Sequence, residues 1–330
     1  MAKIQEWMIV HKYMTDYTPQ TEWIERRGIL VWIAEVCTSL GTGLYLISLF
    51  FSLVPGYEII TWWGMLVAWL IIMFLKIPLH LIYFGKPLRF WRTIPPFSNA
   101  WKTSWFARGI IFSILFGTFA FIQLVFSFLT LDVFNIGLQF SANGLAILSG
   151  FEILFKVLGG IFAFMGGIYP GFIMNYCKAI QFWNSGLLPV VLIIGGILDG
   201  CALLMAIGLT QAGAGIDGHI VELVSAILLI VNIFFIAVYL LSATYIGTAG
   251  KVSTIKLLKG SQAPVFWLGV IILGMIIPLA ISLYTLTFGA SIIPLLIIAI
   301  LLHTIGAFAL KYCILKVALY KPLFAVNLGV

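Results

Sequence analysis

A small set of ionisable side chains interrupts the long apolar stretches of this sequence, and these residues are the most able to do chemistry. They are Glu35, Lys76, His80, Glu152, Lys156, Asp199, His303 and Lys311. An ionisable group within an apolar span is costly to bury, so each one is a functional candidate by default. Long lysine side chains can also snorkel toward the surface, which is the simpler interpretation for Lys76 and Lys311.

Several polar and aromatic residues are expected at one depth, close to the ends of three apolar stretches. They are Trp32, Glu35, His80, Tyr83 and Tyr169. A quinone needs a flat apolar slot for its ring, hydrogen-bond partners for its two carbonyls and groups that deliver protons. These residue types supply all three, so they are candidates for quinone binding. The alternative is that His80 and Tyr83 are interfacial residues with satisfied hydrogen bonds.

The remaining candidates suggest proton relay or structural pairing. Glu152 and Lys156 are four residues apart, so they lie on one helix face and are expected to pair. Asp199 and His303 fall near the middle of their stretches, where an unpaired charge is least tolerable. All four are candidates for a proton relay, with a structural ion pair or a protonated, paired side chain as the alternative.

The composition requires a membrane to surround these residues. Of 330 residues, 62% are hydrophobic and 9% are charged, whereas soluble domains carry about 25% charged residues. A helix needs about 20 apolar residues to cross the hydrocarbon core. The stretches are continuously apolar rather than alternating, which excludes a β-barrel. The fold class is therefore all-α integral membrane, with about eight transmembrane helices expected at 28–53, 59–83, 107–131, 147–175, 187–211, 220–246, 264–288 and 292–318.

The net charge is +7, and no basic run indicates nucleic-acid binding. The cations are therefore interpreted as setting the orientation of the chain in the membrane. Lys and Arg occur before the first span, after the second, fourth and sixth, and at the end of the chain. The connectors 54–58, 132–146, 212–219 and 289–291 contain none. Cation-rich connectors mark the cytoplasmic side. The sequence thus predicts a multi-pass protein of the cytoplasmic (inner or plasma) membrane with both termini in the cytoplasm.

Metal centres are not expected in this chain. The four cysteines stand singly, without the CxxC spacing of zinc or iron–sulfur sites. Haem b ligated by two histidines needs both at matching depth. His80 and His303 lie within spans at different depths, and His11 and His219 lie outside them. The sequence therefore predicts no haem and no metal.

The connector after the second span carries the most specific motif. It reads Gly-Lys-Pro-Leu-Arg-Phe-Trp-Arg over 85–92 and continues to Ser-Trp at 104–105. This segment resembles the Gly-Arg/Lys-Pro-x-Arg-Phe-Trp-Arg … Ser-Trp signature of NrfD/PsrC-type (polysulfide reductase-like) membrane subunits. The stretches 32–43 and 169–189, the latter with Phe-Trp-Asn-Ser, are similar to the same family. Members often carry Asp or His where this chain has Tyr83, and His80 lies one turn earlier on the same face.

The resemblance implies a membrane anchor that passes electrons between quinone and an iron–sulfur subunit paired with a catalytic subunit. It implies a non-covalent quinone, menaquinone or ubiquinone, between the first, second and fourth spans, near the face where the partner docks. The expected docking residues are Lys86, Arg89, Trp91, Arg92, Trp105 and Arg108. We expect an interfacial segment (1–27), a first four-helix bundle with the quinone site (28–178), and a second bundle with the C-terminal tail (179–330).

Two other function classes fit the same composition. A secondary transporter also uses two helical halves and spans interrupted by Pro and Gly. The third hypothesis is an anchor that never binds quinone and either conducts protons or has only a structural role. The aromatic density of the connector favours a docked partner over transport.

Overall fold

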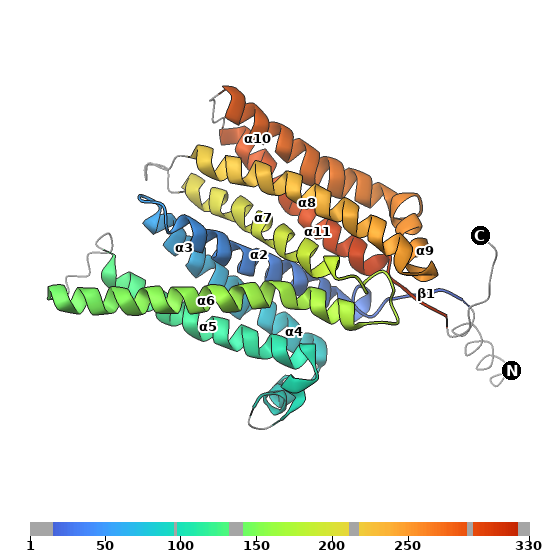
Figure 1. The fold of residues 1–330 in the computed structure, drawn as a ribbon, viewed down its shortest axis with the longest axis horizontal. Helices are drawn as coiled ribbons and strands as arrows, with labels where there is room; N and C mark the ends of the chain where they lie inside the picture. The colour runs from blue at the N-terminus through green and yellow to red at the C-terminus, as the bar shows by residue number, and fades with distance from the viewer. Residues whose placement is uncertain (1–15, 96–97, 132–140, 211–217, 289–292, 323–330) are drawn as a thin grey trace.

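The computed structural model describes residues 16–95, 98–131, 141–210, 218–288 and 293–322. Within these ranges, 8 helices are long and apolar enough to cross a membrane, which confirms the all-α membrane fold. The helical elements are α2 (Ile29–Phe51), α3 (Glu58–Leu70), η2 (Ile71–Lys76), α4 (Ile77–Phe84), α5 (Trp105–Thr130), α6 (Ala142–Tyr176), α7 (Leu187–Thr210), α8 (Gly218–Ile246), α9 (Thr248–Leu258), η6 (Val265–Ile276), α10 (Ile277–Phe288) and α11 (Ile293–Lys316). They lie roughly side by side in Figure 1, with α2 and α7 in the middle.

Two of the eight spans contain a π-helical segment, and in both a proline follows it closely. Span α3–η2–α4 has Pro78 just after η2, and span η6–α10 has Pro278 just after η6. Proline has no N–H to donate to the carbonyl four residues earlier, so the helix must locally change its hydrogen bonding. Segments of π-helix often occur at functional sites. Here η2 carries Lys76, and the carbonyl of Gly274 in η6 accepts a bond from another helix.

The central contact between α2 and α7 depends on glycine. A Cβ atom added to Gly43 would overlap the backbone of Gly196, and one added to Gly200 would overlap the backbone of Gly43. Small residues allow the backbones of membrane helices to approach closely. These glycines of α2 and α7 therefore pack directly against each other, and this contact brings Ser39 of α2 beside Asp199 of α7.

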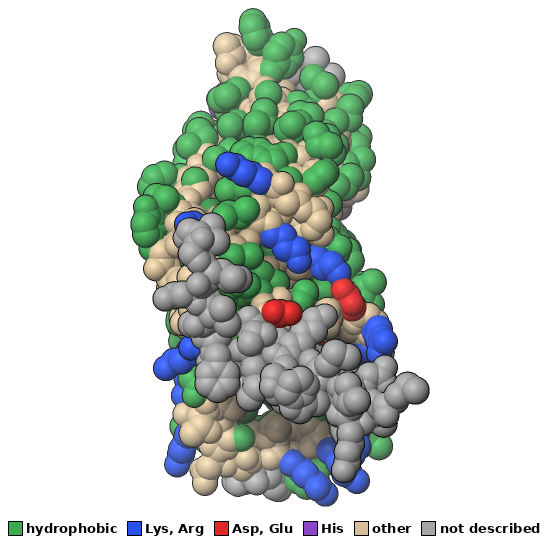
Figure 2. Space-filling view, turned by 90° about the vertical axis from the view of Figure 1, so that its right-hand side faces the viewer, with side chains coloured by type: hydrophobic (Ala, Val, Ile, Leu, Met, Phe, Trp, Pro, Cys, Tyr) green, Lys and Arg blue, Asp and Glu red, His purple; other side chains and the backbone are tan. Residues whose placement is uncertain are grey.

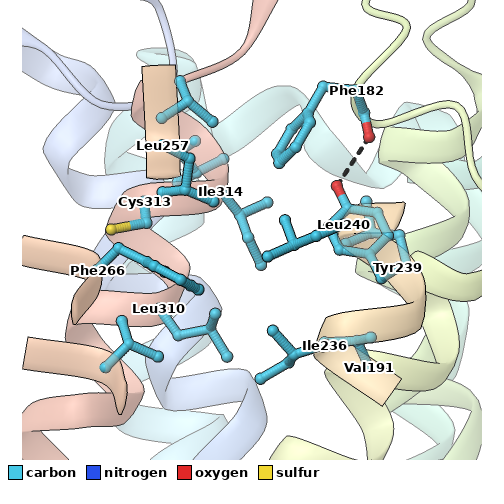
Figure 3. Packing of buried hydrophobic residues seen from close by; sticks show 14 of the residues in the cluster. Phe182, Val191, Ile236, Tyr239, Leu240, Leu257, Phe266, Leu310, Cys313 and Ile314 are labelled. Atoms are coloured by element: carbon cyan, nitrogen blue, oxygen red, sulfur yellow. Dashed lines mark hydrogen bonds between the residues drawn. The ribbon is translucent and has the colours of Figure 1, made fainter. Parts of the chain in front are cut away.

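A second packing region lies where the later helices meet near the connector end (Figure 3). Phe182, Phe266 and Leu310 are buried there with Tyr239. The Tyr239 hydroxyl donates to the Phe182 carbonyl oxygen over 2.8 Å, which satisfies the one polar atom of that ring. The Phe-Trp-Asn-Ser segment is thus held in place by packing, and the Trp183 indole donates to the Ile314 carbonyl oxygen over 2.9 Å.

The described ends of the chain meet at one end of the helix stack, at the right of Figure 1. The strands β1 (Thr18–Pro19) and β2 (Leu319–Tyr320) pair antiparallel, and Tyr320 also bridges to Ile180. Lys316 donates to Glu25 over 2.5 Å across the same join. Figure 2 looks onto this end, where Lys and Arg side chains gather. We call it the connector end, because the basic connector (85–104) leaves from it as well.

Candidate functional site

A cavity of about 280 Å³ opens between α2, α4 and α6 near the connector end. It is lined by Glu35, His80, Tyr83 and Tyr169 together with Trp23, Val31, Phe84, Phe106, Pro170 and Ile173. The structure therefore brings together four of the five residues that the sequence suggested for a quinone. Four polar side chains and a set of aromatic rings line one cavity, which suits a flat molecule with hydrogen-bonding groups.

An apolar cavity of about 220 Å³ adjoins the first one between α4 and α5. The two cavities share His80, Phe84, Phe106 and Tyr169. The second is further lined by Met73, Ile77, Leu81, Phe90, Ile110 and Ile114 among others. The two cavities therefore adjoin at these shared side chains, and the second is lined mainly by apolar side chains, with Lys76 and Ser113 as further polar groups.

The hydrogen bond of His80 defines what its ring offers to the cavity. Its Nδ1 lies 3.0 Å from the carbonyl oxygen of Lys76, one turn earlier on the same span. A carbonyl oxygen only accepts, so Nδ1 carries the hydrogen. In the neutral ring Nε2 is then an acceptor, and after protonation it becomes a donor. His80 can therefore take a proton at Nε2 from a bound hydroxyl or return one to a bound carbonyl.

Lys76 is held inside the protein and does not snorkel to the surface. Its side chain is 5% exposed and its Nζ donates to the Ser113 hydroxyl over 2.5 Å. The same Nζ lies 5.2 Å from the centroid of the Tyr169 ring, which is a cation–π contact. Lys76 and Glu35 also interact electrostatically. A cation, a carboxyl and a tyrosine are thus coupled at the boundary between the two cavities.

Trp32 is not among the residues that line either cavity. Its indole N–H donates to the Phe308 carbonyl oxygen over 3.1 Å, and its ring meets Phe308 and Tyr312 edge to face. These partners belong to α11, so Trp32 fastens α2 to α11.

Asp199 is the centre of a buried polar cluster between α2, α7 and α11. Its carboxylate accepts from Ser39 over 2.7 Å, and lies 3.1 Å from both His303 Nε2 and Lys311 Nζ. Asp199 is 2% exposed and Lys311 7% exposed, so Lys311 does not snorkel either. Ser39 lies one helical turn after Glu35 on the same face of α2, so the cluster lies one turn away from a residue that lines the cavity.

The second bond of His303 places a proton inside this cluster. Its Nδ1 lies 3.0 Å from the carbonyl oxygen of Gly274. In a regular α-helix this oxygen would accept from the N–H four residues later, but that residue is Pro278, which has no N–H. Nδ1 therefore carries a hydrogen. Nε2 faces the Asp199 carboxylate, and that contact needs a further proton on one of the two partners to be a hydrogen bond. The His303–Asp199 pair is a place where a proton can be held and passed on.

Glu152 and Lys156 form the expected ion pair on α6, with 2.9 Å between Nζ and Oε1. Glu152 also accepts from Ser127 over 2.5 Å and from Thr130 over 2.9 Å. The pair lines a separate cavity of about 90 Å³ with Glu58 and Gln123 among other residues. The structure thus puts the four relay candidates into two groups, Asp199 with His303 and Glu152 with Lys156.

The basic connector presents both partly buried and exposed members of the predicted docking set. Trp105 stacks on Phe172 with 4.5 Å between ring centroids, and Arg108 lies 4.6 Å from the Trp105 centroid. Arg108 also donates to the Trp101 and Lys102 carbonyl oxygens over 2.8 and 2.7 Å. These two residues hold the connector to the helices. Lys86, Arg89, Trp91 and Arg92 are exposed at its surface.

The family model of polysulphide reductase, NrfD, matches residues 29–321 of this chain. The chain belongs to this family. It is also similar to Protein NrfD of Escherichia coli, with 30% identity over 173 residues, covering 50% of this chain and 52% of that protein. A Protein NrfD homolog of Haemophilus influenzae is 24% identical over 175 residues, covering 51% of this chain and 52% of the relative. The matched part spans about half the length of each relative.

Membership in the NrfD family confirms the resemblance read from the connector motif and from the two shorter stretches. The sequence did not identify Lys76 and Lys311 as parts of buried clusters. A lysine side chain can snorkel, so its position in the sequence does not show whether its ammonium group is buried. One signal was present, since Lys76 lies one turn before His80 on the same helix face. Among the described residues, no group of three or more His, Cys, Asp and Glu is placed to hold a metal ion.

Proposed function

We propose that this NrfD-family chain is the quinone-reactive membrane subunit of a respiratory oxidoreductase complex. The observation that carries the proposal is the pair of adjoining cavities, the first lined by Glu35, His80 and Tyr169 and the second lined mainly by apolar side chains. A quinone has the same division, with a polar head and a long apolar tail. The residues that line the space therefore fit menaquinone or ubiquinone, held without a covalent bond.

Each polar residue has a role in this proposal. When bound, the quinone supplies two-electron, two-proton redox chemistry. His80 Nε2 and the Tyr169 hydroxyl hydrogen-bond to the head, and Glu35 exchanges protons with them. Lys76 orients the Tyr169 ring and balances the charge of Glu35. Tyr83 closes the cavity at the connector end.

The proposal extends to proton relay and to the two halves of the chain. Asp199 with His303 serves as a relay pair that supplies or removes protons, and Glu152 with Lys156 is the second candidate pair for that role. Residues 28–178 form the half that holds the quinone, and residues 179–330 form the second half. The docked partner is an iron–sulfur subunit with its catalytic subunit, which the exposed cations and Trp91 of the basic connector attract. The cation distribution supports a connector end that faces the cytoplasm.

Tyr169→Phe and Glu35→Gln test the proposal in the purified complex. Each variant removes one proton-exchanging group from the cavity while its shape is preserved. We expect quinone-coupled turnover to fall about tenfold or more, which corresponds to about 1.4 kcal/mol or more in the barrier. Partner activity with an artificial electron acceptor or donor stays unchanged.

Tyr245→Phe is the matched control on an exposed side chain, and it is expected to behave as wild type. Wild-type quinone kinetics in both cavity variants would show that the cavity takes no part in the reaction. Purification of the chain alone, with transport of a solute in vesicles, would favour a secondary transporter instead.

A further inference from the structure

Glu222 is a buried carboxyl that the sequence analysis did not single out. It lies in the first turns of α8, at the end of the molecule opposite to the connector end. The residue is 1% exposed, and its Oε1 has no hydrogen-bond partner among the described residues. An intramembrane carboxyl without a cation is costly, which marks the residue as a functional candidate.

Glu222 lines a cavity of about 180 Å³. The other lining residues are Tyr57, Ile60, Leu204, Met205, Gly208, Leu209, Val221, Ile293 and Leu296. Tyr57 is the other titratable residue in this set, and no Lys or Arg belongs to it. The connectors at this end of the chain also lack Lys and Arg in the sequence. The carboxyl therefore faces an apolar space with no cation lining it.

A smaller cavity continues from this one toward the Asp199 cluster. Its volume is about 30 Å³, and its lining includes Met205, Ser225, Ser282 and His303. Met205 lines both cavities. Ser225 lies one helical turn after Glu222 on the same face of α8. A cavity needs about 10–15 Å³ and polar partners to hold a water molecule, and this one has both.

From the small cavity the polar groups continue through the Asp199 cluster. His303 contacts Asp199, and Ser39 of α2 donates to the same carboxylate. Glu35, which lines the first cavity, lies one helical turn before Ser39 on the same face of α2. The polar groups therefore follow one another from Ser225 to Glu35 by way of these side chains.

We propose that the quinone cavity exchanges protons with the opposite membrane face through Glu222. This inference rests on the proposed quinone function. In each step a proton leaves one oxygen or nitrogen and joins the next, and the electrons pass separately to or from the iron–sulfur partner. Glu222 is the group that loads or releases the proton at the far face, and a water between Ser225 and His303 completes the line.

The Glu152 cavity is the competing route, and its contacts argue against it. Glu152 is already bonded by Ser127, Thr130 and Lys156. Its cavity shares no lining residue with the first two cavities or with the Asp199 cluster. A proton on Glu152 therefore has no described polar path to the quinone cavity.

The sidedness of the pH change tests the inference. The complex is placed in vesicles with its connector end outward, and a pH-sensitive dye is enclosed in the lumen. We expect quinone-coupled turnover to change the pH of the lumen. The lumen becomes more alkaline when quinone is reduced and more acid when quinol is oxidised. An ionophore for protons abolishes this change. A pH change confined to the outer medium would overturn the inference, even where the cavity variants still impair quinone turnover.

Substitution of Glu222 tests whether this residue carries the proton at the far face. Glu222→Gln is expected to abolish the lumen pH change, and Glu222→Asp to restore part of it, whereas Glu58→Gln at the same end has no effect. An unchanged lumen signal in Glu222→Gln, or its loss in Glu152→Gln alone, would assign the route elsewhere. Failure of the proposed function looks different, because quinone turnover would then be insensitive to Tyr169→Phe and Glu35→Gln.

Infrared difference spectra of the purified chain provide a readout that needs no quinone. Between two pH values we expect a carboxylic acid band that is present in wild type and absent in Glu222→Gln. Spectra that do not differ between the two proteins would show that Glu222 exchanges no proton, and would overturn the inference. This measurement also remains available if a variant no longer assembles with its partners.

Discussion

At the scale of single residues, the buried carboxylate of Asp199 gathers polar contacts from three side chains. Ser39, His303 and Lys311 come from two other helices and all meet its carboxylate. Removing one partner of a buried pair leaves an uncompensated charge, which is far more costly than losing a surface pair. Asp199 therefore joins three helices at the same point where it can pass a proton.

Asp199→Asn is expected to destabilise the protein by about 3–5 kcal/mol, because Lys311 is left as a buried, unpaired cation. The double variant Asp199→Asn with Lys311→Met should recover part of this loss. Thermal unfolding of the purified protein in detergent measures both. Lys251→Met on the exposed side of α9 is the control and should unfold as wild type. Equal stability of wild type and Asp199→Asn would contradict the charge pairing.

At the scale of helices, two features position the candidate site. The π-helical segment η2 precedes Pro78 and carries Lys76, which bonds Ser113 of α5 and contacts Tyr169 of α6. The glycine contact between α2 and α7 holds Ser39 against Asp199. Both features are departures from a regular helix surface, and both place a polar side chain where it can bond a neighbouring helix.

Gly43→Ala is expected to push α2 away from α7, because the added methyl group would overlap the Gly196 carbonyl oxygen. Overpacking of this kind costs about 1–3 kcal/mol. Gly150→Ala on α6 is the matched control, since no atom lies within 4 Å of the added methyl group. It should be neutral or slightly stabilising, because alanine favours a helix over glycine. Unfolding curves that shift equally for both variants would contradict close packing at Gly43.

At the scale of the whole molecule, charge and polarity divide the two ends. The connector end carries the described cations outside the helices, both described chain ends and the opening of the candidate site. The far end carries Glu222 and its cavity, with no Lys or Arg in its connectors. Such a division suits a protein that receives electrons at one membrane face and exchanges protons with the other.

Replacing Lys86, Arg89 and Arg92 together with Gln should weaken assembly with the proposed iron–sulfur partner. These side chains are exposed, so the folded chain should retain wild-type thermal stability. Rim charges mainly change association rates and salt dependence. Co-purification at increasing salt measures the effect, with Lys251→Gln and Lys256→Gln on α9 as the control. Undiminished co-purification of the triple variant would place the docking surface elsewhere.

Much of this architecture was predictable from the sequence because the bilayer imposes simple rules. Eight long apolar stretches could become only membrane helices, and the connector motif led to the NrfD family. Glu35, His80, Tyr83 and Tyr169 were predicted to share a depth, and they line one cavity. Trp32 had the right depth, but the rotation of α2 turns it toward α11. Depth follows from position in a span, whereas rotation depends on which helix packs on which face.

The sequence by itself determined that the chain is an all-α membrane protein, where its spans lie, and to which family it belongs. These properties depend on local hydropathy and on short motifs, which need no knowledge of neighbouring helices. The tertiary structure alone decided that Lys76 and Lys311 are buried in clusters and that Glu222 faces a cavity. The reason is physical, because the partner of a charged side chain in a span comes from another helix, and helix packing depends on close contacts such as that of Gly43 with Gly196.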